Sequence, residues 1–380
     1  MKKLMMLVAA VAASVALADG AGTPTAKIKS ITNRYPWNGK IDVEYELSNL
    51  ESTLGPLDTA LILFTKFVSG VVEITKTNDL SDAELAARTV RRTFDCRELF
   101  GENKWDAEAQ SAAKLEKFAY AVIDVSGGAN TNSYPVTYYM SAPAGDWNTD
   151  EYKTSKIVLY YVKEGKYLGN QKTEQTTTGF WIGLFPITEA QYAKVMGPGN
   201  STTKPQANVS YTTLRGTDNP NATVADNSFL KLLCDRTGLD GFDLPTESQW
   251  EIACRAGSDK TYYWGDIKGE ADKYMWYFDD NSSSSAQGVG QKLPNAWGLY
   301  DMAGNVWEWC RDGYHSPLTV DSSADVCLDL EAGYYLGSRV RRGGAYNRTA
   351  DFGASSSRDS NGVDNFNFDM GFRLSRMSSK

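Results

Sequence analysis

The C-terminal half of the chain, from Phe180 onward, is rich in tryptophan, glycine and asparagine. Three segments within it carry the start and stop signals of helices, namely a capping side chain in front and a glycine behind. They run from Thr188 to Gly197, from Asn227 to Gly238, and from Thr246 to about Gly257. In the first and third, Gln191 and Gln249 complete reciprocal capping boxes. These signals predict short helices separated by long irregular segments.

Five short motifs follow one another through this half of the chain. They are Phe180-Trp181-Ile182-Gly183, Asp243-Leu244-Pro245-Thr246-Glu247-Ser248-Gln249-Trp250-Glu251, Gly304-Asn305-Val306-Trp307-Glu308-Trp309, Arg342-Gly343-Gly344 and Gly371-Phe372-Arg373. In the second motif, Pro245 fixes the angle at which the chain enters the helix after Thr246, and Trp250 is expected to face the core. Together, over residues 173–376, the motifs resemble the formylglycine-generating enzyme, or sulfatase-modifying factor, family. The resemblance implies an irregular α+β domain related to C-type lectins, which we place at residues 179–376.

The segment after Arg342-Gly343-Gly344 bears on the chemistry that the resemblance implies. In the oxidative enzymes of the family, two cysteines shortly after the glycine pair bind copper and activate oxygen to convert a substrate cysteine into formylglycine. Here residues 347–358 contain no cysteine. Thiolate is the soft ligand that selects copper(I), and asparagine, serine and threonine cannot replace it. Copper chemistry is therefore not expected, and no catalytic residue is predicted.

The cysteines and the single histidine limit other chemistry. His315 is the only histidine, so a multi-histidine metal site within one chain is impossible. The iron-dependent sulfoxide synthases of the wider family are excluded on the same ground. The cysteines are Cys96, Cys234, Cys254, Cys310 and Cys327. Their odd number means that at least one stays unpaired or pairs with another molecule. The nearest pair, Cys310 with Cys327, is the first disulfide expected; the alternative is that all five are buried and reduced.

A turn between Asp301 and Glu308 places two carboxylates around a glycine, and carboxylates and carbonyls are the hard oxygen donors that calcium prefers. In the family the matching positions bind calcium. Carried over, the ligands are the side chains of Asp301 and Glu308 and the carbonyls of Gly304 and Val306. The alternative is that Glu308 pairs with an arginine while Trp307 and Trp309 fill the core. A second calcium site of the family needs an asparagine where this chain has Trp276, so it is not predicted.

Aromatic residues gather at 262–264 and 274–278, where carboxylates and an amide follow at once. Aromatic faces beside such groups suit sugar rings or an extended peptide. The predicted binding residues are Trp264, Trp276, Tyr277, Asn347, Arg348 and Arg358. The alternative is that the aromatic side chains only form the core of a domain poor in regular structure.

The N-terminal part predicts a different domain. Residues 41–47 alternate apolar and charged side chains, as a half-buried strand does, and further strands are expected at 60–67, 118–125 and 156–162. One helix is expected at 82–92, opened by a capping box of Ser81 and Glu84. Residues 25–165 thus predict a β-rich domain, preferably a sandwich. Residues 166–178, with little apolar content, are expected to be a linker.

The net charge and the N-terminal segment indicate which partners and which cellular location to expect. The formal net charge of −8 makes nucleic acid an unlikely partner. Two lysines, an apolar run to Leu17 and a small-residue cleavage site predict an export leader at residues 1–18, and therefore a periplasmic or extracellular protein. No later stretch is apolar enough to span a membrane.

Three functions follow from these patterns. The first is a non-catalytic module that binds a peptide or a glycan. The second is a formylglycine-generating or other oxidoreductase with an atypical centre, since the fold does not dictate the function. The third is a role in cell-surface assembly, and no oligomeric state is predicted.

Overall fold

The computed structural model describes residues 25–33, 40–48, 61–69, 72–79, 84, 87, 89–95, 113–117, 119–139, 141–142, 146–169, 172–278, 284–315, 321–328 and 337–377. The predicted leader, Ser81 and Cys96 lie outside these residues. The chain forms two compact units, one ending at Phe118 and one running from Ala119 to Met377. Within the described residues, no helix is both long and apolar enough to cross a membrane.

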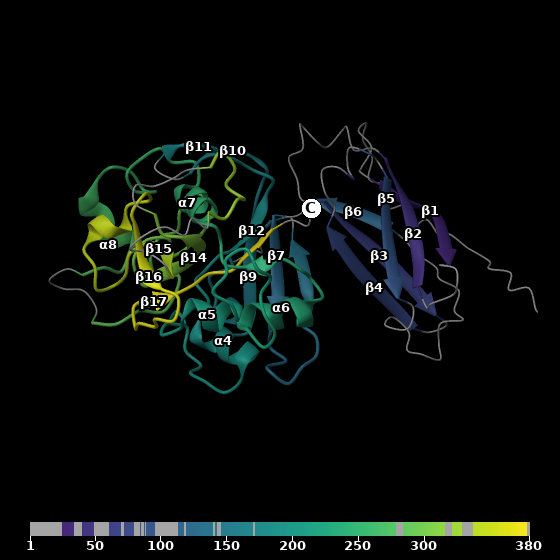
Figure 1. Ribbon diagram of the computed structural model, residues 1–380, viewed down its shortest axis with the longest axis horizontal. Helices are drawn as coiled ribbons and strands as arrows, with labels where there is room; N and C mark the ends of the chain where they lie inside the picture. Colours follow the sequence, from purple (N-terminus) through teal and green to yellow (C-terminus); the bar gives the residue numbers. More distant parts are fainter. Residues whose placement is uncertain are drawn as a thin grey trace, which may run out of the picture. The chain divides into compact units, whose positions relative to one another are not determined.

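The N-terminal unit holds one antiparallel sheet (Figure 1). Its strands are β1 (Thr25–Asn33), β2 (Lys40–Ser48), β3 (Leu61–Ser69), β4 (Val72–Asp79), β5 (Thr89–Asp95) and β6 (Ala113–Lys117), in the order β4-β3-β6-β1-β2-β5. On β2, Val43, Tyr45 and Leu47 are buried, and this alternation confirms the predicted strand. The unit is β-rich as expected, but its described strands belong to one sheet rather than to the two sheets of a sandwich.

The helix expected at residues 82–92 is wrong in its second half. Residues 84 and 87 are helical, but the chain then enters β5, which pairs with β2. Val90 and Phe94 are buried on one face of β5, and Thr89 and Thr93 are exposed. Pairing with β2 and burial of these two side chains override the local capping signal.

The boundary expected near residue 165 is also wrong. Strand β7 (Tyr120–Asp124) pairs with β8 (Val136–Tyr139) and with β9 (Lys156–Val162), and β9 pairs with β12 (Phe180–Gly183). Strand β12 in turn pairs with β18 (Ser375–Met377), which pairs with β13 (Phe242–Asp243), so the sheet order is β13-β18-β12-β9-β7-β8. The C-terminal domain therefore begins near Ala119, because its first strands belong to the same sheet as the last strand of the domain.

The expected linker at 166–178 is a hairpin of β10 (Gly165–Leu168) and β11 (Glu174–Thr177). Gln175 on β11 is buried, and its amide donates to Ser248 Oγ at 2.9 Å and to the Asp321 carbonyl at 2.8 Å. Tyr167 on β10 packs against the core, with its ring centre 5.6 Å from that of Trp297, so the segment is part of the domain rather than a linker.

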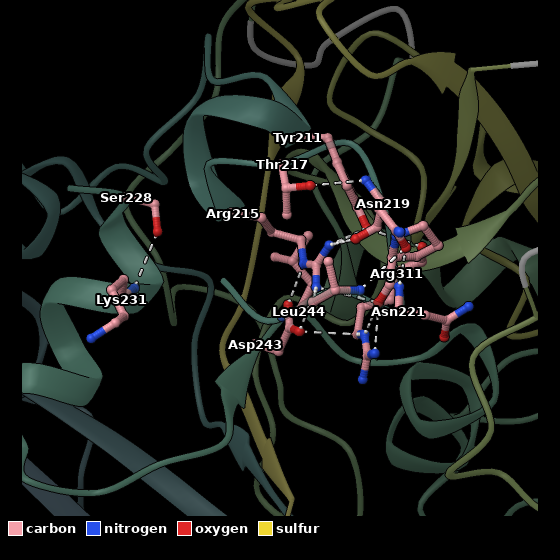
Figure 2. Close-up of polar contacts among 12 residues, drawn as sticks. Tyr211, Arg215, Thr217, Asn219, Asn221, Ser228, Lys231, Asp243, Leu244 and Arg311 are labelled. Atoms are coloured by element: carbon pink, nitrogen blue, oxygen red, sulfur yellow. Dashed lines mark hydrogen bonds and ion pairs between the residues drawn. The ribbon is translucent and has the colours of Figure 1, made fainter. Parts of the chain in front are cut away.

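The helices confirm most of the sequence prediction. They are α3 (Glu151–Thr154), α4 (Glu189–Met196), α5 (Tyr211–Arg215), α6 (Phe229–Thr237), α7 (Glu247–Arg255) and α8 (Ala271–Tyr274), with 3₁₀ turns at Lys268–Glu270 and Ala350–Gly353. Both predicted capping boxes form, at Thr188 and Thr246. The cap of α6 is Ser228 rather than Asn227: the Lys231 amide donates to Ser228 Oγ at 3.2 Å, as Figure 2 shows, and Asn227 takes a positive φ of 63°.

A second sheet completes the C-terminal unit (Figure 1). Its strands are β14 (Trp307–Gly313), β15 (Ser338–Arg342), β16 (Arg358–Gly362) and β17 (Met370–Gly371), in the order β16-β15-β14-β17. Trp250 on α7 is fully buried, as expected, and belongs to the core cluster with Ile182 of β12 and Val340 of β15. The core therefore joins both sheets through α7.

Candidate functional site

A groove opens beside the chain that follows the glycine pair. It has a volume of about 350 Å³. Its lining includes Glu189, Lys204, Gln206, Asn208, Tyr346 and Phe368. The side chains come from the start of α4, the segment that follows α4, and two loops of the C-terminal region. The groove thus combines amides, one charge of each sign and two aromatic rings.

The glycine pair sets the position of Tyr346. Gly343 and Gly344 have φ of 92° and 77°, a region that glycine enters without steric cost. A Cβ on Gly343 would lie 3.2 Å from the Trp250 ring, and one on Gly344 would lie 3.0 Å from the backbone of Phe352. The chain can turn this tightly only with glycine at both positions. Tyr346 then donates its amide to the Asn305 carbonyl at 3.0 Å, which anchors it beside the groove.

Two phenylalanines stand out from the loop between β16 and β17. Phe366 is 63% exposed and Phe368 is 78% exposed. The loop that carries them is tied down, because the Asn208 amide donates to the Asn367 carbonyl at 3.0 Å and Thr212 Oγ1 donates to Asp364 Oδ1 at 2.8 Å. Exposed aromatic rings that gather on a held backbone are typical of interaction surfaces. Sequence reasoning missed them, although two rings within a run of asparagine and aspartate were the available signal.

Trp264 does not present a face to a ligand. Its ring is stacked between Tyr262, at 4.5 Å between centroids, and Tyr274, at 5.0 Å. The indole Nε1 donates to the Ile267 carbonyl at 3.2 Å. Both faces of the ring are covered, so the prediction that Trp264 stacks on a sugar is corrected: the residue packs the domain.

Trp276 and Tyr277 are likewise engaged away from the groove. The Lys292 ammonium lies 4.0 Å above the centre of the Trp276 ring, and the Trp276 backbone pairs with Gly304. The Tyr277 hydroxyl donates to Asp272 Oδ1 at 2.8 Å. Neither residue lines the groove.

The three predicted binding residues that follow Tyr346 in the sequence have different surroundings in the structure. Arg358 donates to both carboxylate oxygens of Glu247, at 2.7 and 2.8 Å, and its guanidinium lies 4.4 Å from the centre of the Tyr314 ring, so its role is structural. Arg348 remains 40% exposed with its guanidinium 3.7 Å from Asp369. Asn347 directly follows Tyr346 and is exposed. Asn347 and Arg348 thus come directly after a residue that lines the groove, but none of the three predicted residues lines it.

The expected Cys310–Cys327 disulfide is wrong, because both thiols are free. Cys310 on β14 is buried near the charges of Arg342 and Glu247. Cys327 is half-buried after β14, and burial raises the pKa of its thiol.

The other described thiols are inert as well. Burial raises the pKa of the Cys254 thiol to about 12 and also raises the pKa of Cys310. Cys234 is buried, and burial raises the pKa of its thiol too. A buried thiol that stays protonated is a poor nucleophile and a poor metal ligand. None of the four described cysteines lines the groove.

The residues expected to bind calcium are arranged differently. Both Glu308 carboxylate oxygens accept from the Arg373 guanidinium, at 2.7 and 2.8 Å, and one also accepts from Trp250 Nε1 at 2.6 Å. The Asp301 carboxylate accepts from the Gly290 amide at 2.7 Å and from Asn305 Nδ2 at 3.2 Å. All four oxygens thus accept N–H groups.

The backbone ligands expected for calcium lie in the same packed turn. Gly304 has φ of 72°, and a Cβ there would lie 2.1 Å from the Trp276 carbonyl; Val306 is buried. Across the part of the chain that the structure describes, no group of three acidic, histidine or cysteine side chains gathers for a metal. The pairing of Glu308 with Arg373 is the alternative kept open above, in which Glu308 pairs with an arginine.

A second buried polar cluster surrounds Arg215 on α5, as Figure 2 shows. Arg215 donates to both carboxylate oxygens of Asp243, at 2.7 and 3.0 Å, and to the Asn219 carbonyl at 2.6 Å. Arg311 donates to the Pro220 carbonyl at 2.7 Å. The two guanidinium groups hold the loop at 217–222 by its carbonyls, so this cluster is a structural clamp.

Comparison with known proteins gives three results. The family model for the "Sulfatase-modifying factor enzyme 1-like domain" matches residues 137–378. The formylglycine-generating enzyme of Thermomonospora curvata is 33% identical over 142 residues, which are 34% of this chain and 46% of that enzyme. The chaperone protein LppX of Paenibacillus barcinonensis is 24% identical over 188 residues, covering 39% of this chain and 67% of that protein.

Among solved structures, the Treponema denticola variable protein 1 aligns with a TM-score of 0.47 and 25% identity, over 58% of this chain and 95% of that one. The match to the Thermomonospora curvata enzyme covers 46% of that enzyme, so this chain spans less than half of its length.

Proposed function

Since residues 137–378 place this chain in the sulfatase-modifying factor enzyme 1-like family, we propose that its C-terminal domain is a non-catalytic module that binds an extended peptide of a partner protein in the Tyr346 groove. The family assignment confirms the resemblance drawn from the five motifs. One observation supports the proposal: just after the glycine pair, the chain lines a groove that contains two aromatic rings, and no cysteine is present there. Residues 346–377 contain no cysteine.

The lining favours a peptide as the ligand. Gln206 and Asn208 offer amides, which can pair with the alternating N–H and carbonyl groups of an extended backbone. Tyr346 and Phe368 offer rings against which apolar side chains can pack. The relative named as a chaperone protein is consistent with recognition of a polypeptide. A glycan is the other ligand class that this composition can accept.

The second candidate function is formylglycine generation. It is supported by the 33% identity with the enzyme of Thermomonospora curvata over part of the chain. It would need a redox centre that does not use cysteines at the positions after the glycine pair. The two candidates differ in whether a peptide thiol is consumed.

We expect the purified full chain, incubated with copper, oxygen and a sulfatase-motif peptide, to leave the peptide cysteine unchanged. No thiolate is present beside the groove to hold copper(I). Mass spectrometry of the peptide measures the outcome, and the Thermomonospora curvata enzyme run in parallel is the positive control. Conversion of the peptide thiol to an aldehyde would establish the oxidoreductase and refute the non-catalytic module.

A random peptide library displayed on phage supplies the ligand for a second test. Peptides selected on the full chain are expected to lose roughly tenfold or more in affinity when Phe368→Ser or Tyr346→Ala is introduced, because aromatic anchors dominate binding energy. The matched control is Ile267→Ser, which removes an apolar side chain that is 65% exposed and does not line the groove. Equal losses in all three variants, or selective binding on a glycan array and none to peptides, would count against peptide recognition.

A further inference from the structure

The groove beside Tyr346 is lined by two charged side chains, Glu189 and Lys204. Each oxygen of the Glu189 carboxylate already accepts a hydrogen bond, one from Asn200 Nδ2 at 3.0 Å and one from Thr202 Oγ1 at 2.6 Å. Glu189 is also the first residue of α4, where the backbone dipoles of the helix stabilise a negative charge. The negative charge of the groove is therefore compensated within the chain.

The positive charge of the groove is not compensated in this way. The Lys204 ammonium donates to Ser285 Oγ at 3.4 Å, and it forms no ion pair with any carboxylate of the residues that the structure describes. An ammonium group can donate three hydrogen bonds, and a hydroxyl oxygen carries no charge. Lys204 therefore offers the groove a positive charge with donors to spare.

The backbone of Lys204 is held beside the start of α4. Its carbonyl accepts from the Glu189 amide at 2.9 Å, and its own amide donates to Thr202 Oγ1 at 3.1 Å. The residue is half-buried. Because these contacts fix the base of the side chain, little backbone freedom is lost when the ammonium meets a ligand.

A peptide that occupies the groove covers the Lys204 ammonium and displaces water from it. Removing a charged group from water is unfavourable unless a partner replaces the water, and a carboxylate does so through a charge-assisted hydrogen bond. We propose that Lys204 makes the groove selective for peptides that carry a carboxylate. The inference rests on the proposed peptide binding and adds the chemical class of the ligand. An aspartate or glutamate side chain and the C-terminus of the peptide are the two sources of such a group.

The test uses the peptides selected on the full chain from the phage library. Each is synthesised in three forms: with its acidic side chains and an amidated C-terminus, with every acidic side chain replaced by its amide and the same C-terminus, and with those replacements and a free C-terminus. Isothermal titration with the full chain measures the affinities. We expect the first or the third form to bind roughly tenfold more tightly than the second. The first form identifies a side chain as the source of the carboxylate, and the third identifies the C-terminus.

This advantage is expected to disappear in Lys204→Gln, while the affinity of the second form changes little. Lys204→Arg keeps the charge and should keep most of the advantage. The matched control is Lys231→Gln, which removes the same charge from α6 outside the groove and should leave all three affinities unchanged.

Equal affinities of the three forms, or an advantage that persists in Lys204→Gln, would overturn the inference. Selected peptides that depend on a basic side chain and lose affinity in Glu189→Gln would overturn it as well. Binding that depends on Tyr346 but not on Lys204 refutes this inference alone. If the library yields no peptide, the proposed function fails, and the inference fails with it.

Discussion

Replacing Arg373 by glutamine is expected to lower the free energy of unfolding by about 3–5 kcal/mol, since removing one partner of a buried ion pair leaves the other charge uncompensated. The Arg373 side chain is 0% exposed and that of Glu308 is 1% exposed, so water cannot replace the lost guanidinium. The Gly183 and Tyr300 carbonyls lose a donor at the same time. Both effects act in the same direction.

Urea unfolding followed by tryptophan fluorescence measures this loss. Arg348→Gln is the matched control, because its partner Asp369 lies at 3.7 Å and its side chain is 40% exposed. That change is expected to cost at most about 1 kcal/mol, as exposed ion pairs do. Arg373→Lys keeps the charge but cannot reach all the acceptors of the guanidinium, so its loss should lie between the other two. Equal stability of the Arg373→Gln and Arg348→Gln variants would contradict the predicted role.

Replacing Arg215 by glutamine is also expected to lower the free energy of unfolding by about 3–5 kcal/mol, because it leaves the carboxylate of Asp243 without its buried partner. The Arg215 side chain is 0% exposed and pairs with Asp243 through two hydrogen bonds (Figure 2). It also holds the Asn219 and Ala222 carbonyls, at 2.6 and 2.8 Å. The variant should therefore lose global stability and also free the loop at 217–222.

Two measurements separate these effects. Urea unfolding reports the global loss, and limited proteolysis under native conditions should show cleavage within 217–222 that the unaltered chain resists. Lys231→Gln on α6 is the control, because Lys231 pairs with Asp235 on the exposed surface and should contribute at most about 1 kcal/mol. The clamp would be refuted if Arg215→Gln unfolded at the same urea concentration as Lys231→Gln and left the loop uncut.

The candidate site could be predicted from the sequence only in part. Asn347 and Arg348 directly follow Tyr346, which lines the groove, but neither of the two predicted residues lines it. Trp264 was predicted from composition alone, and composition does not reveal that Tyr262 and Tyr274 cover both of its faces. Phe368 lies 22 positions after Tyr346 in the sequence, and no local pattern places the two side chains on one groove.

The sequence by itself determined what depends on near neighbours or on the presence of a residue type. The capping boxes at Thr188 and Thr246 join partners three residues apart, so they form as expected. The absence of cysteine after Gly344 is likewise fixed by composition, whatever the fold.

Only the tertiary structure decided what depends on distant partners. Strand β5 replaced half of an expected helix because β2 lies beside it, and β7 to β9 moved the domain boundary because they pair into the sheet of β12 and β18. Arg373 forms an ion pair with Glu308, which lies 65 positions earlier in the sequence. The physical reason is the same in each case. Hydrogen bonds and ion pairs form between the groups that folding brings within about 3 Å of each other, and this distance in space cannot be read from the separation of two residues in the sequence.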